Sequence, residues 1–425
     1  MLRFSKIKKL FKMCNRAFDT VGSCNCEYSV PSDNKSTDKK SYRTVKTAEK
    51  IDKYLKSVPF AGKLVSEIPE KHLHLKQSDC ISAFYLIDDG VASKIVWQIV
   101  KTLGNIENKL ICETNAGFGF ITKRLLWKGA KVRIYETCPE FRKKLRIICQ
   151  NYVNRTELFT KDLYHLPTMS YIDKIDRGSR VQQLLNGIPT RPWSSDPAII
   201  IIGAMPKNNF ISYLMRMVVH QGEIINFGRV EIFAIMKSRN YQKLNAGPEV
   251  SCKSYTAFTV LFQLFFDYEF IDNYDRKAFI PYETNRKKKE KESKVVSEGE
   301  MCLVHMTLKK ELPTEKDQLL ALYYFVMQGY GRGRKRIIPT LEFHLLTSKI
   351  LKKANIKLSI FTEFRELRPK EILMLFTEMT QNPSYHNSPF IALIESELLK
   401  RETVETDSLQ EQNESEKPTI KDTEL

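Results

Sequence analysis

The stretch LICETNAGFGFITKRLLWKGAKVRIYE, residues 110–136, decides the fold that we predict for this chain. A short apolar run ends in Glu113, and a small-residue loop with two glycines follows it. The next residues favour a helix that Gly129 ends, and a second apolar run ends in Glu136. This order of strand, glycine turn, helix, strand and acid is typical of a nucleotide-binding β-α-β unit. Glycines let the backbone approach a ligand closely, and the second acid is placed to accept hydrogen bonds from ribose hydroxyls.

The charge of the chain favours a polyanionic partner. Its 425 residues are enough for two domains, and its net charge at pH 7 is +18. Nucleic acid is the simplest such partner, and a basic organellar protein without one is the alternative. The apolar runs are too short to cross a bilayer, so no membrane span is predicted. The nine cysteines include no CxxC pair and the histidines lack zinc-ligand spacing, which predicts a reducing compartment and no metal site.

The N-terminal 18 residues, MLRFSKIKKLFKMCNRAF, are basic and contain no acid. Their apolar residues recur at intervals near three or four, which predicts an amphipathic helix. A basic, acid-free amphipathic helix is typical of a mitochondrial presequence, and a basic arm on a nuclear or cytosolic protein is the alternative. Residues 19–50 are polar and are predicted to form a linker.

Strand and helix patterns alternate from residue 51 to 312. Helices are predicted over 88–103, 120–128, 141–152, 208–220 and 255–266, and residues 167–197 are predicted to be an irregular loop. Strands are predicted over 110–112, 132–135, shortly before 162, and over 198–202, 229–236, 268–274 and 301–308. Such alternation implies a parallel sheet, here of about six strands, with helices on both faces. Only a loop separates the last two strands, so we expect them to pair antiparallel.

The C-terminal part of the chain changes character. Within residues 313–400, helices are predicted over 319–327, 341–353 and 370–380, and no further strand pattern follows. This segment is predicted to be a small helical second domain. Residues 401–425 are acidic, carry Pro418 and lack aromatic residues, which predicts a disordered tail.

Four blocks of sequence together resemble the ribosomal RNA adenine dimethyltransferase family over roughly residues 60–400. The blocks are ETNAGFGFITKRLLWKGAKVRIYE at 113–136, PW at 192–193, IIGAMP at 201–206 and FGRVEIFAIMKSRNYQKL at 227–244. The resemblance implies a class I methyltransferase fold. This is a Rossmann-like α/β sheet whose last strand is antiparallel, followed by a small helical C-terminal domain.

The cofactor half of the family pattern is kept. The family's E-x-x-P-G-x-G-x-L-T corresponds to Glu113, Ala116, Gly117, Gly119, Ile121 and Thr122, with Ala116 in place of the proline. Glu136 matches the ribose-binding acid, and Asp162 matches the acid that contacts the adenine amino group of S-adenosylmethionine. The resemblance thus implies an S-adenosylmethionine site at Glu113, Gly117, Gly119, Glu136 and Asp162. A plain tight turn and ordinary acids at strand ends are the alternative.

The catalytic half of the pattern is replaced. The family carries N-L-P-[YF] after the fourth strand, where the asparagine and backbone carbonyls hold the target amine and the ring stacks on the flipped base. The corresponding residues here are Ala204, Met205, Pro206 and Lys207. Base stacking contributes roughly 1–3 kcal/mol, and lost positioning of a reacting amine costs orders of magnitude in rate. Phe210 offers a ring from the following helix but no amide. Efficient N6-methylation of adenine is therefore not expected.

Two further basic clusters are candidates for nucleic-acid contact. The first, in the loop before the last strand, consists of Arg286, Lys287, Lys288 and Lys289, with Lys291 after an acid. A solvated surface is the alternative there. The second lies in YGRGRKR, residues 330–336, and consists of Tyr330, Arg332, Arg334, Lys335 and Arg336. Glycine-spaced arginines can follow a phosphate backbone, and the tyrosine can stack on an unpaired base. Arg229 either contacts nucleic acid or pairs with Glu231.

The resemblance implies two candidate functions. One is a transcription initiation factor that helps the single-subunit mitochondrial RNA polymerase to melt promoter DNA, located in the nucleoid of the mitochondrial matrix. The other is an active dimethyltransferase acting on mitochondrial small-subunit ribosomal RNA. The replaced motif favours the factor, because a binder needs the fold and charged grooves but not the asparagine. The retained cofactor residues favour the enzyme. A small-molecule methyltransferase is disfavoured by the net charge of +18 and by the helical C-terminal domain.

Overall fold

The computed structural model describes residues 49–53, 55–57, 64–73, 76–77, 81–251, 253–284, 295–296, 299–331, 335–344 and 359–399. Several predictions concern residues outside these ranges. They are the presequence over 1–18, nearly all of the linker over 19–50, the acidic tail over 401–425, the cluster at Arg286, Lys287, Lys288, Lys289 and Lys291, and Arg332 and Arg334.

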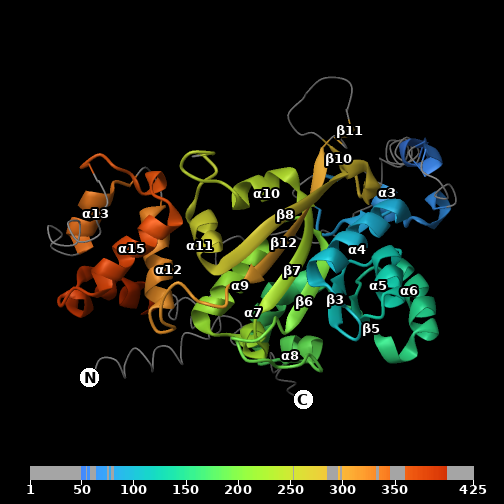
Figure 1. Cartoon of the computed structure of the whole chain (residues 1–425), viewed down its shortest axis with the longest axis horizontal. Coiled ribbons are helices and arrows are strands. Elements are labelled where there is room, and N and C mark those ends of the chain that lie inside the picture. Colours follow the sequence, from blue (N-terminus) through green and yellow to red (C-terminus); the bar gives the residue numbers. More distant parts are fainter. Residues whose placement is uncertain are drawn as a thin grey trace, which may run out of the picture.

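A seven-stranded sheet forms the centre of the molecule, with the strand order β5-β4-β3-β6-β7-β12-β8 (Figure 1). Its strands are β3 (Leu110–Thr114), β4 (Lys131–Tyr135), β5 (Thr156–Phe159), β6 (Ile199–Met205), β7 (Val230–Lys237), β8 (Phe266–Asp275) and β12 (Glu300–Leu308). The pairs from β5 to β7 are parallel, and β12 is antiparallel to both β7 and β8. The predicted class I methyltransferase sheet with an antiparallel last strand is therefore confirmed.

The sheet has an apolar core on each face, as its strand sequences require. All seven residues of β6, IIIIGAM, are buried, which is typical of a parallel strand covered on both sides. In β7, Ile232 and Ala234 belong to one core cluster, whereas Phe233 and Ile235 belong to the other. This alternation follows from the two-residue period of a strand.

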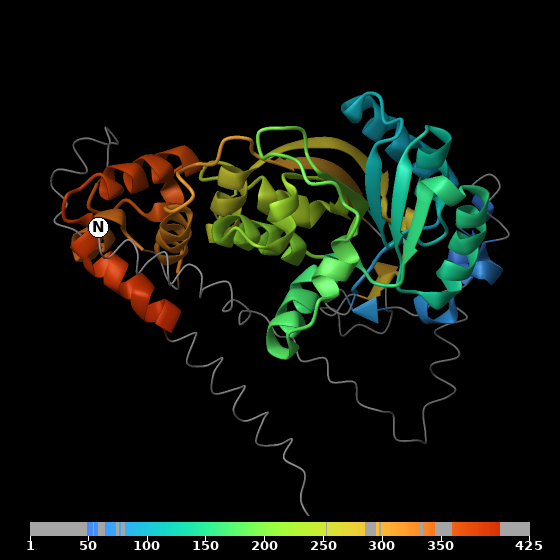
Figure 2. The same cartoon turned by 90° about the horizontal axis from the view of Figure 1, so that it is seen from below.

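Two layers of helices cover these cores (Figure 2). On one face lie α4 (Asp89–Leu103), α5 (Phe120–Trp127) and α6 (Pro139–Asn151). On the other lie α7 (Leu166–Asp176), α8 (Arg180–Leu185), α9 (Asn209–His220), α10 (Ser238–Leu244) and α11 (Ala257–Phe265). Asp88 begins α4 by accepting a 3.1 Å hydrogen bond from the Val91 N–H, as an N-cap does. None of the described helices has the length and hydropathy that a bilayer crossing needs.

Two sequence-based predictions about connections were wrong. Residues 167–197 are not all loop, because α7 and α8 occupy much of this stretch and bury Leu166, Met169, Val181, Leu184 and Leu185. Proline, glycine and serine around these helices masked their apolar spacing. The connection from β8 to β12 also contains more than a loop. It includes β9 (Phe279–Ile280), β10 (Glu283–Thr284) and β11 (Val295–Val296), of which β9 pairs with β2 (Tyr85–Leu86) and β10 with β1 (Lys76–Gln77).

The C-terminal region is helical, as predicted. It contains α12 (Leu319–Gly329), α13 (Ile337–His344), α15 (Pro369–Thr380) and a helix over 389–399. Phe325, Phe376 and Phe390 from these helices share one apolar cluster with α9 and α11. The Tyr255 hydroxyl also donates to the Leu367 carbonyl at 2.9 Å. The helices therefore extend the core on one side of the sheet, and the domain boundaries at 312 and 400 stay predictions.

Candidate cofactor and target-base site

The glycine loop between β3 and α5 needs both of its glycines. Gly117 and Gly119 have φ of 57° and 74°, in the left-handed region that side chains rarely adopt. A Cβ on Gly119 would lie 2.5 Å from Cδ1 of Ile148 on α6, and one on Gly117 would lie 3.1 Å from Cδ1 of Tyr85. Gly119 therefore lets α6 pack onto the loop, and Gly117 lets the Tyr85 ring approach the backbone.

The carboxylate of Glu136, at the end of β4, is enclosed by backbone donors. The N–H of Gly117 donates to its Oε2 at 2.9 Å, and the N–H of Cys138 donates to its Oε1 at 2.7 Å. The residue is 0% exposed, and this burial raises its pKa to about 7. The acid that the sequence assigns to ribose thus already has a donor on each oxygen.

Glu113 and Asp162 lie beside the same loop and also have partners within the chain. The Thr122 hydroxyl donates to Glu113 Oε2 at 2.6 Å, and burial raises the pKa of Glu113 to about 8. Asp162 Oδ1 accepts from the Thr114 hydroxyl at 2.6 Å and from the Tyr164 N–H at 2.8 Å. The fold thus brings the three acids together at the carboxyl ends of β3, β4 and β5. In open α/β sheets, ligands bind at this edge.

Aromatic side chains cover the edge where the ribose would bind. The Tyr85 ring, 3% exposed, packs against Gly117 and lies 4.7 Å from the Phe141 ring and 4.8 Å from that of His72. Ile51 and Leu55, from the helical residues 49–53 and 55–57, belong to the same buried cluster. Sequence analysis did not identify this cover, because its residues come from separate segments that only the fold brings together.

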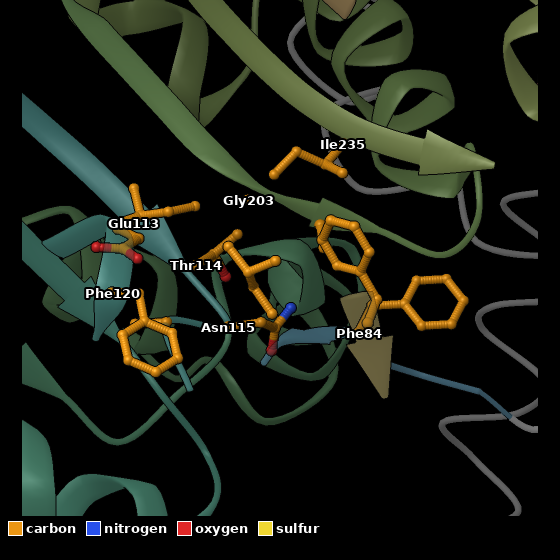
Figure 3. Close-up of a pocket in the computed structure, with 12 residues that line it drawn as sticks. Phe84, Glu113, Thr114, Asn115, Phe120, Gly203 and Ile235 are labelled. Atoms are coloured by element: carbon orange, nitrogen blue, oxygen red, sulfur yellow. The ribbon is translucent and has the colours of Figure 1, made fainter. Parts of the chain in front are cut away.

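The target-base half of the site is a small cavity with both polar and apolar residues in its wall. Gly203 and Ala204, near the end of β6, line a cavity of ≈ 20 Å³ together with Phe84, Asn115 and Ile235 (Figure 3). That volume holds roughly one water molecule. Phe84 is held in place by two cations, since Arg276 Cζ and Lys237 Nζ lie 4.4 and 5.1 Å from its ring centre.

The rest of the replaced motif provides no base platform. Met205 and Pro206 are buried and Lys207 is exposed. Phe210 does not offer its ring to the site, because it is 2% exposed and packs 5.1 Å from the Tyr164 ring inside the core. The amide of Asn240 donates to the Pro206 carbonyl at 2.9 Å, so one of the backbone acceptors in this motif already has a partner.

The residues of the cofactor edge are enclosed in this structure. The cavity of ≈ 20 Å³ beside Glu113 has room for roughly one water molecule. The ribose acid, Glu136, has no exposed surface. The acids and glycines that the family uses are present, but Phe84 lines the cavity beside Glu113 and Tyr85 packs against Gly117. Binding would require these rings to move.

The raised pKa values predict that the protein loses stability as pH rises. Between pH 5 and 7 the unfolded chain has released the Glu113 and Glu136 protons, whereas the folded chain keeps them. The free energy of unfolding should therefore fall by about 1.4 kcal/mol per pH unit for each retained proton. The contribution is complete below the unfolded pKa, near 4.5, and is lost as pH rises through 7 to 8.

Urea denaturation between pH 5 and 8 measures this effect. Glu113→Gln should flatten the pH dependence by up to about 1.4 kcal/mol per pH unit, because glutamine cannot ionise. Glu107→Gln, at an exposed glutamate, is the matched control and should leave the pH dependence unchanged. Equal slopes for all three proteins would show that Glu113 is ionised in the folded state.

Arg229 binds carbonyl groups of the protein itself. Its Nε donates to the Trp193 carbonyl at 2.9 Å, its Nη1 to that of Leu308 at 3.1 Å, and its Nη2 to that of Ser195 at 2.5 Å. The alternative pairing with Glu231 is not seen among the described residues, where the Glu231 carboxylate lies 2.7 Å from His305 Nε2. Arg229 joins the 192–197 loop to the end of β12, and its contact with nucleic acid stays a prediction.

In the described part of the second basic cluster, an exposed aromatic ring lies beside Arg336. Tyr330 donates its hydroxyl to the Phe364 carbonyl at 2.9 Å and lies edge-on to Tyr255, so its ring is part of the core packing. The exposed Arg336 instead places its guanidinium 5.0 Å from the Phe361 ring centre, and Phe361 is 62% exposed. Sequence spacing could not identify Phe361, because it is brought beside Arg336 only by the fold.

Metal ligation finds no support in the described part of the chain, where no three His, Cys, Asp or Glu side chains are grouped to hold an ion.

The sequence matches the profile of the ribosomal RNA adenine dimethylase family over residues 80–381. A relative from Drosophila melanogaster, "Dimethyladenosine transferase 2, mitochondrial", is 27% identical over 381 residues, which cover 79% of this chain and 84% of that protein. The protein of the same name from Mus musculus is 26% identical over 248 residues, 56% of this chain and 62% of that one.

Solved structures of methyltransferases are also similar to the chain. The crystal structure of the 23S rRNA methyltransferase ErmE has a TM-score of 0.44 and 17% identity, and the match covers 70% of this chain and 100% of that one. A dimethyladenosine transferase from Plasmodium falciparum has a TM-score of 0.43 and 15% identity, covering 72% of this chain and 98% of that one.

Proposed function

Since this chain belongs to the ribosomal RNA adenine dimethylase family, we propose that it is a non-catalytic member that acts as a mitochondrial transcription initiation factor. In this role it helps the mitochondrial RNA polymerase to melt promoter DNA and holds the opened strand. The printed names of its relatives support a mitochondrial location, as does the predicted presequence over residues 1–18. In this role the protein would bind promoter DNA in the nucleoid of the mitochondrial matrix.

The observation that carries this proposal is the state of the target-base site. Ala204 stands where the family places its asparagine, and the adjoining cavity of ≈ 20 Å³ is lined by Phe84 and Ile235. A flipped adenine needs a pocket of its own with stacking and hydrogen-bonding groups. The fold and the net charge of +18 remain, and these are the features that a nucleic-acid binder requires.

A methyltransferase acting on mitochondrial small-subunit ribosomal RNA is the second candidate. It is favoured by the grouping of Glu113, Glu136 and Asp162 at one edge of the sheet, and by the word transferase in the relatives' names. S-adenosylmethionine would be its methyl donor, as the family implies. The cover of Tyr85 over Gly117 counts against it.

Reconstituted transcription separates the two candidates. We expect mitochondrial RNA polymerase to need this chain for run-off transcription from a duplex promoter, with equal yield in the presence and absence of S-adenosylmethionine. Asp162→Asn, which removes the charge at the cofactor edge, should leave the yield unchanged once folding has been checked by circular dichroism. A yield that depends on S-adenosylmethionine would favour the enzyme, and no dependence on the chain would refute the factor.

A further inference from the structure

We propose that the outer face of α4, α5 and α6 binds single-stranded nucleic acid by stacking bases on two exposed tryptophans. We call this surface the tryptophan face and define it by Trp97, Trp127 and the exposed basic residues of the three helices. It lies on the opposite side of the sheet from α9, α11 and the C-terminal helices (Figure 2). The inference therefore does not depend on the basic loop at 330–336 or on the cofactor edge.

Both indole side chains are largely exposed to water, which is energetically unfavourable for apolar groups of this size. Trp97 is 61% exposed and Trp127 is 68% exposed, and they are two of the chain's three tryptophans. Burying a large aromatic side chain is among the most favourable contributions to folding. Two indoles left in water on neighbouring helices therefore indicate a surface that another molecule covers.

The packing of α4 against α5 places both indoles on one side. Arg124 of α5 donates to the Asp89 carboxylate at 2.5 and 2.6 Å and to the Ser93 hydroxyl at 2.7 Å. Trp97 follows Ser93 by one helical turn on α4, and Trp127 follows Arg124 by one turn on α5. Because residues three or four apart lie on the same face of a helix, Trp97 and Trp127 both extend the side on which Arg124 and Ser93 meet.

The same face carries an unbalanced positive charge. Six exposed basic side chains have no carboxylate within 4.0 Å among the described residues, namely Lys94, Lys101, Lys123, Lys128, Lys143 and Arg146. The three helices contain two acids, and both have partners, since Asp89 pairs with Arg124 and Glu140 with Lys71. The Lys101 ammonium lies 5.4 Å from the Trp97 ring centre, so charge and ring adjoin.

Single strands fit this combination better than duplex DNA does. Exposed rings between cations are the platform on which unpaired bases stack, while the cations neutralise the phosphates between those bases. In a duplex the bases are already stacked on each other, so no base would be free to stack on the indoles. An acidic protein would satisfy the charge, and it is treated below as a competing outcome.

Tryptophan fluorescence reports on the proposed contact directly. In the full chain carrying Trp193→Phe, only Trp97 and Trp127 emit, and we expect a single-stranded oligothymidine 20-mer to quench them in a saturable way. The matched control, Trp97→Phe with Trp127→Phe, keeps only Trp193, whose Nε1 donates to the Lys310 carbonyl at 3.0 Å. Its emission should not change. Trp97→Ala with Trp127→Ala should weaken oligonucleotide binding at least about tenfold by fluorescence anisotropy, with circular dichroism as the folding control.

The charge requirement is tested by neutralisation. Changing Lys94, Lys101, Lys123 and Lys128 to Ala should flatten the salt dependence of binding by about two to three units, at roughly 0.7 per neutralised phosphate. The control changes four exposed lysines elsewhere to Ala, namely Lys253, Lys277, Lys316 and Lys370. It should change the salt dependence of binding less.

Three results would overturn the proposal. They are an unchanged indole emission at saturating oligonucleotide, equal quenching by duplex DNA of the same length, and equal quenching by polyglutamate, which would identify a surface for acidic proteins. None of these results bears on the transcription assay above, so the failure of this inference is distinguishable from failure of the proposed function.

Discussion

Incubation with tritiated S-adenosylmethionine and a small-subunit ribosomal RNA hairpin should give methyl transfer at least about 10³-fold slower than an active dimethyltransferase gives. Two causes act together. Ala204 and Lys207 provide neither the amide that holds the target amine nor the ring that stacks on the base. Phe84 lines the cavity beside Glu113 and Tyr85 packs against Gly117, so we expect the donor to bind poorly.

Restoring the motif distinguishes these two causes. Ala204→Asn with Lys207→Tyr returns the family's polar and aromatic groups, but we expect it to leave transfer at background, because the cofactor edge stays covered by Tyr85. Calorimetric titration of S-adenosylmethionine into the wild-type protein should likewise show no saturable heat. Robust turnover by the wild-type chain that Asp162→Ala abolishes would show that the covered edge opens, and it would reverse the ranking of the two functions.

Neutralising the basic loop at 330–336 should strongly weaken the binding of promoter DNA. Changing Arg332, Arg334, Lys335 and Arg336 to Ala should flatten the salt dependence of binding to pre-melted promoter DNA by about two to three units, since each single-strand phosphate contact contributes roughly 0.7. At moderate salt, roughly 0.2 M, the lost phosphate contacts should lower the affinity by about one to two orders of magnitude. Promoter-dependent transcription should fall with it.

We expect the fold to survive this change, because Arg336 is exposed. Among the described residues, its guanidinium group lies over the Phe361 ring, which is also exposed. Circular dichroism and the urea midpoint check this. The control is the same quadruple change at Lys253, Lys277, Lys316 and Lys370. If the loop variant keeps the wild-type salt slope, the loop is a solvated surface. Promoter contact must then lie elsewhere, first at Arg286, Lys287, Lys288 and Lys289.

The sheet could be predicted because its signals are local. A run such as IIIIGAM has to be buried on both faces, and glycines with positive φ stand where β3 turns into α5. The acids Glu113, Glu136 and Asp162 each lie at or shortly after a strand end. Parallel strands bring those ends together, so their meeting at one edge followed from the strand order alone.

The covering of the site could not be predicted, because it depends on contacts between distant segments. Tyr85 reaches Gly117 from the strand before α4, and Phe84 is held by Lys237 and Arg276, which are more than 150 positions away. Arg229 likewise donates to carbonyl groups in the 192–197 loop and at the end of β12 rather than to the acid two positions along. Sequence spacing shows which residue types are present, but it does not show which side chains fill the space between them.

We propose that this chain opens promoter DNA for the polymerase without methyl transfer. The most direct test compares run-off transcription by mitochondrial RNA polymerase on a closed duplex promoter and on the same promoter with a mismatched, already open start site. The chain should be required on the duplex, and much of that requirement should disappear on the open template, with no S-adenosylmethionine in either reaction. An equal requirement for the chain on both templates, or no requirement on the duplex, would contradict the claim.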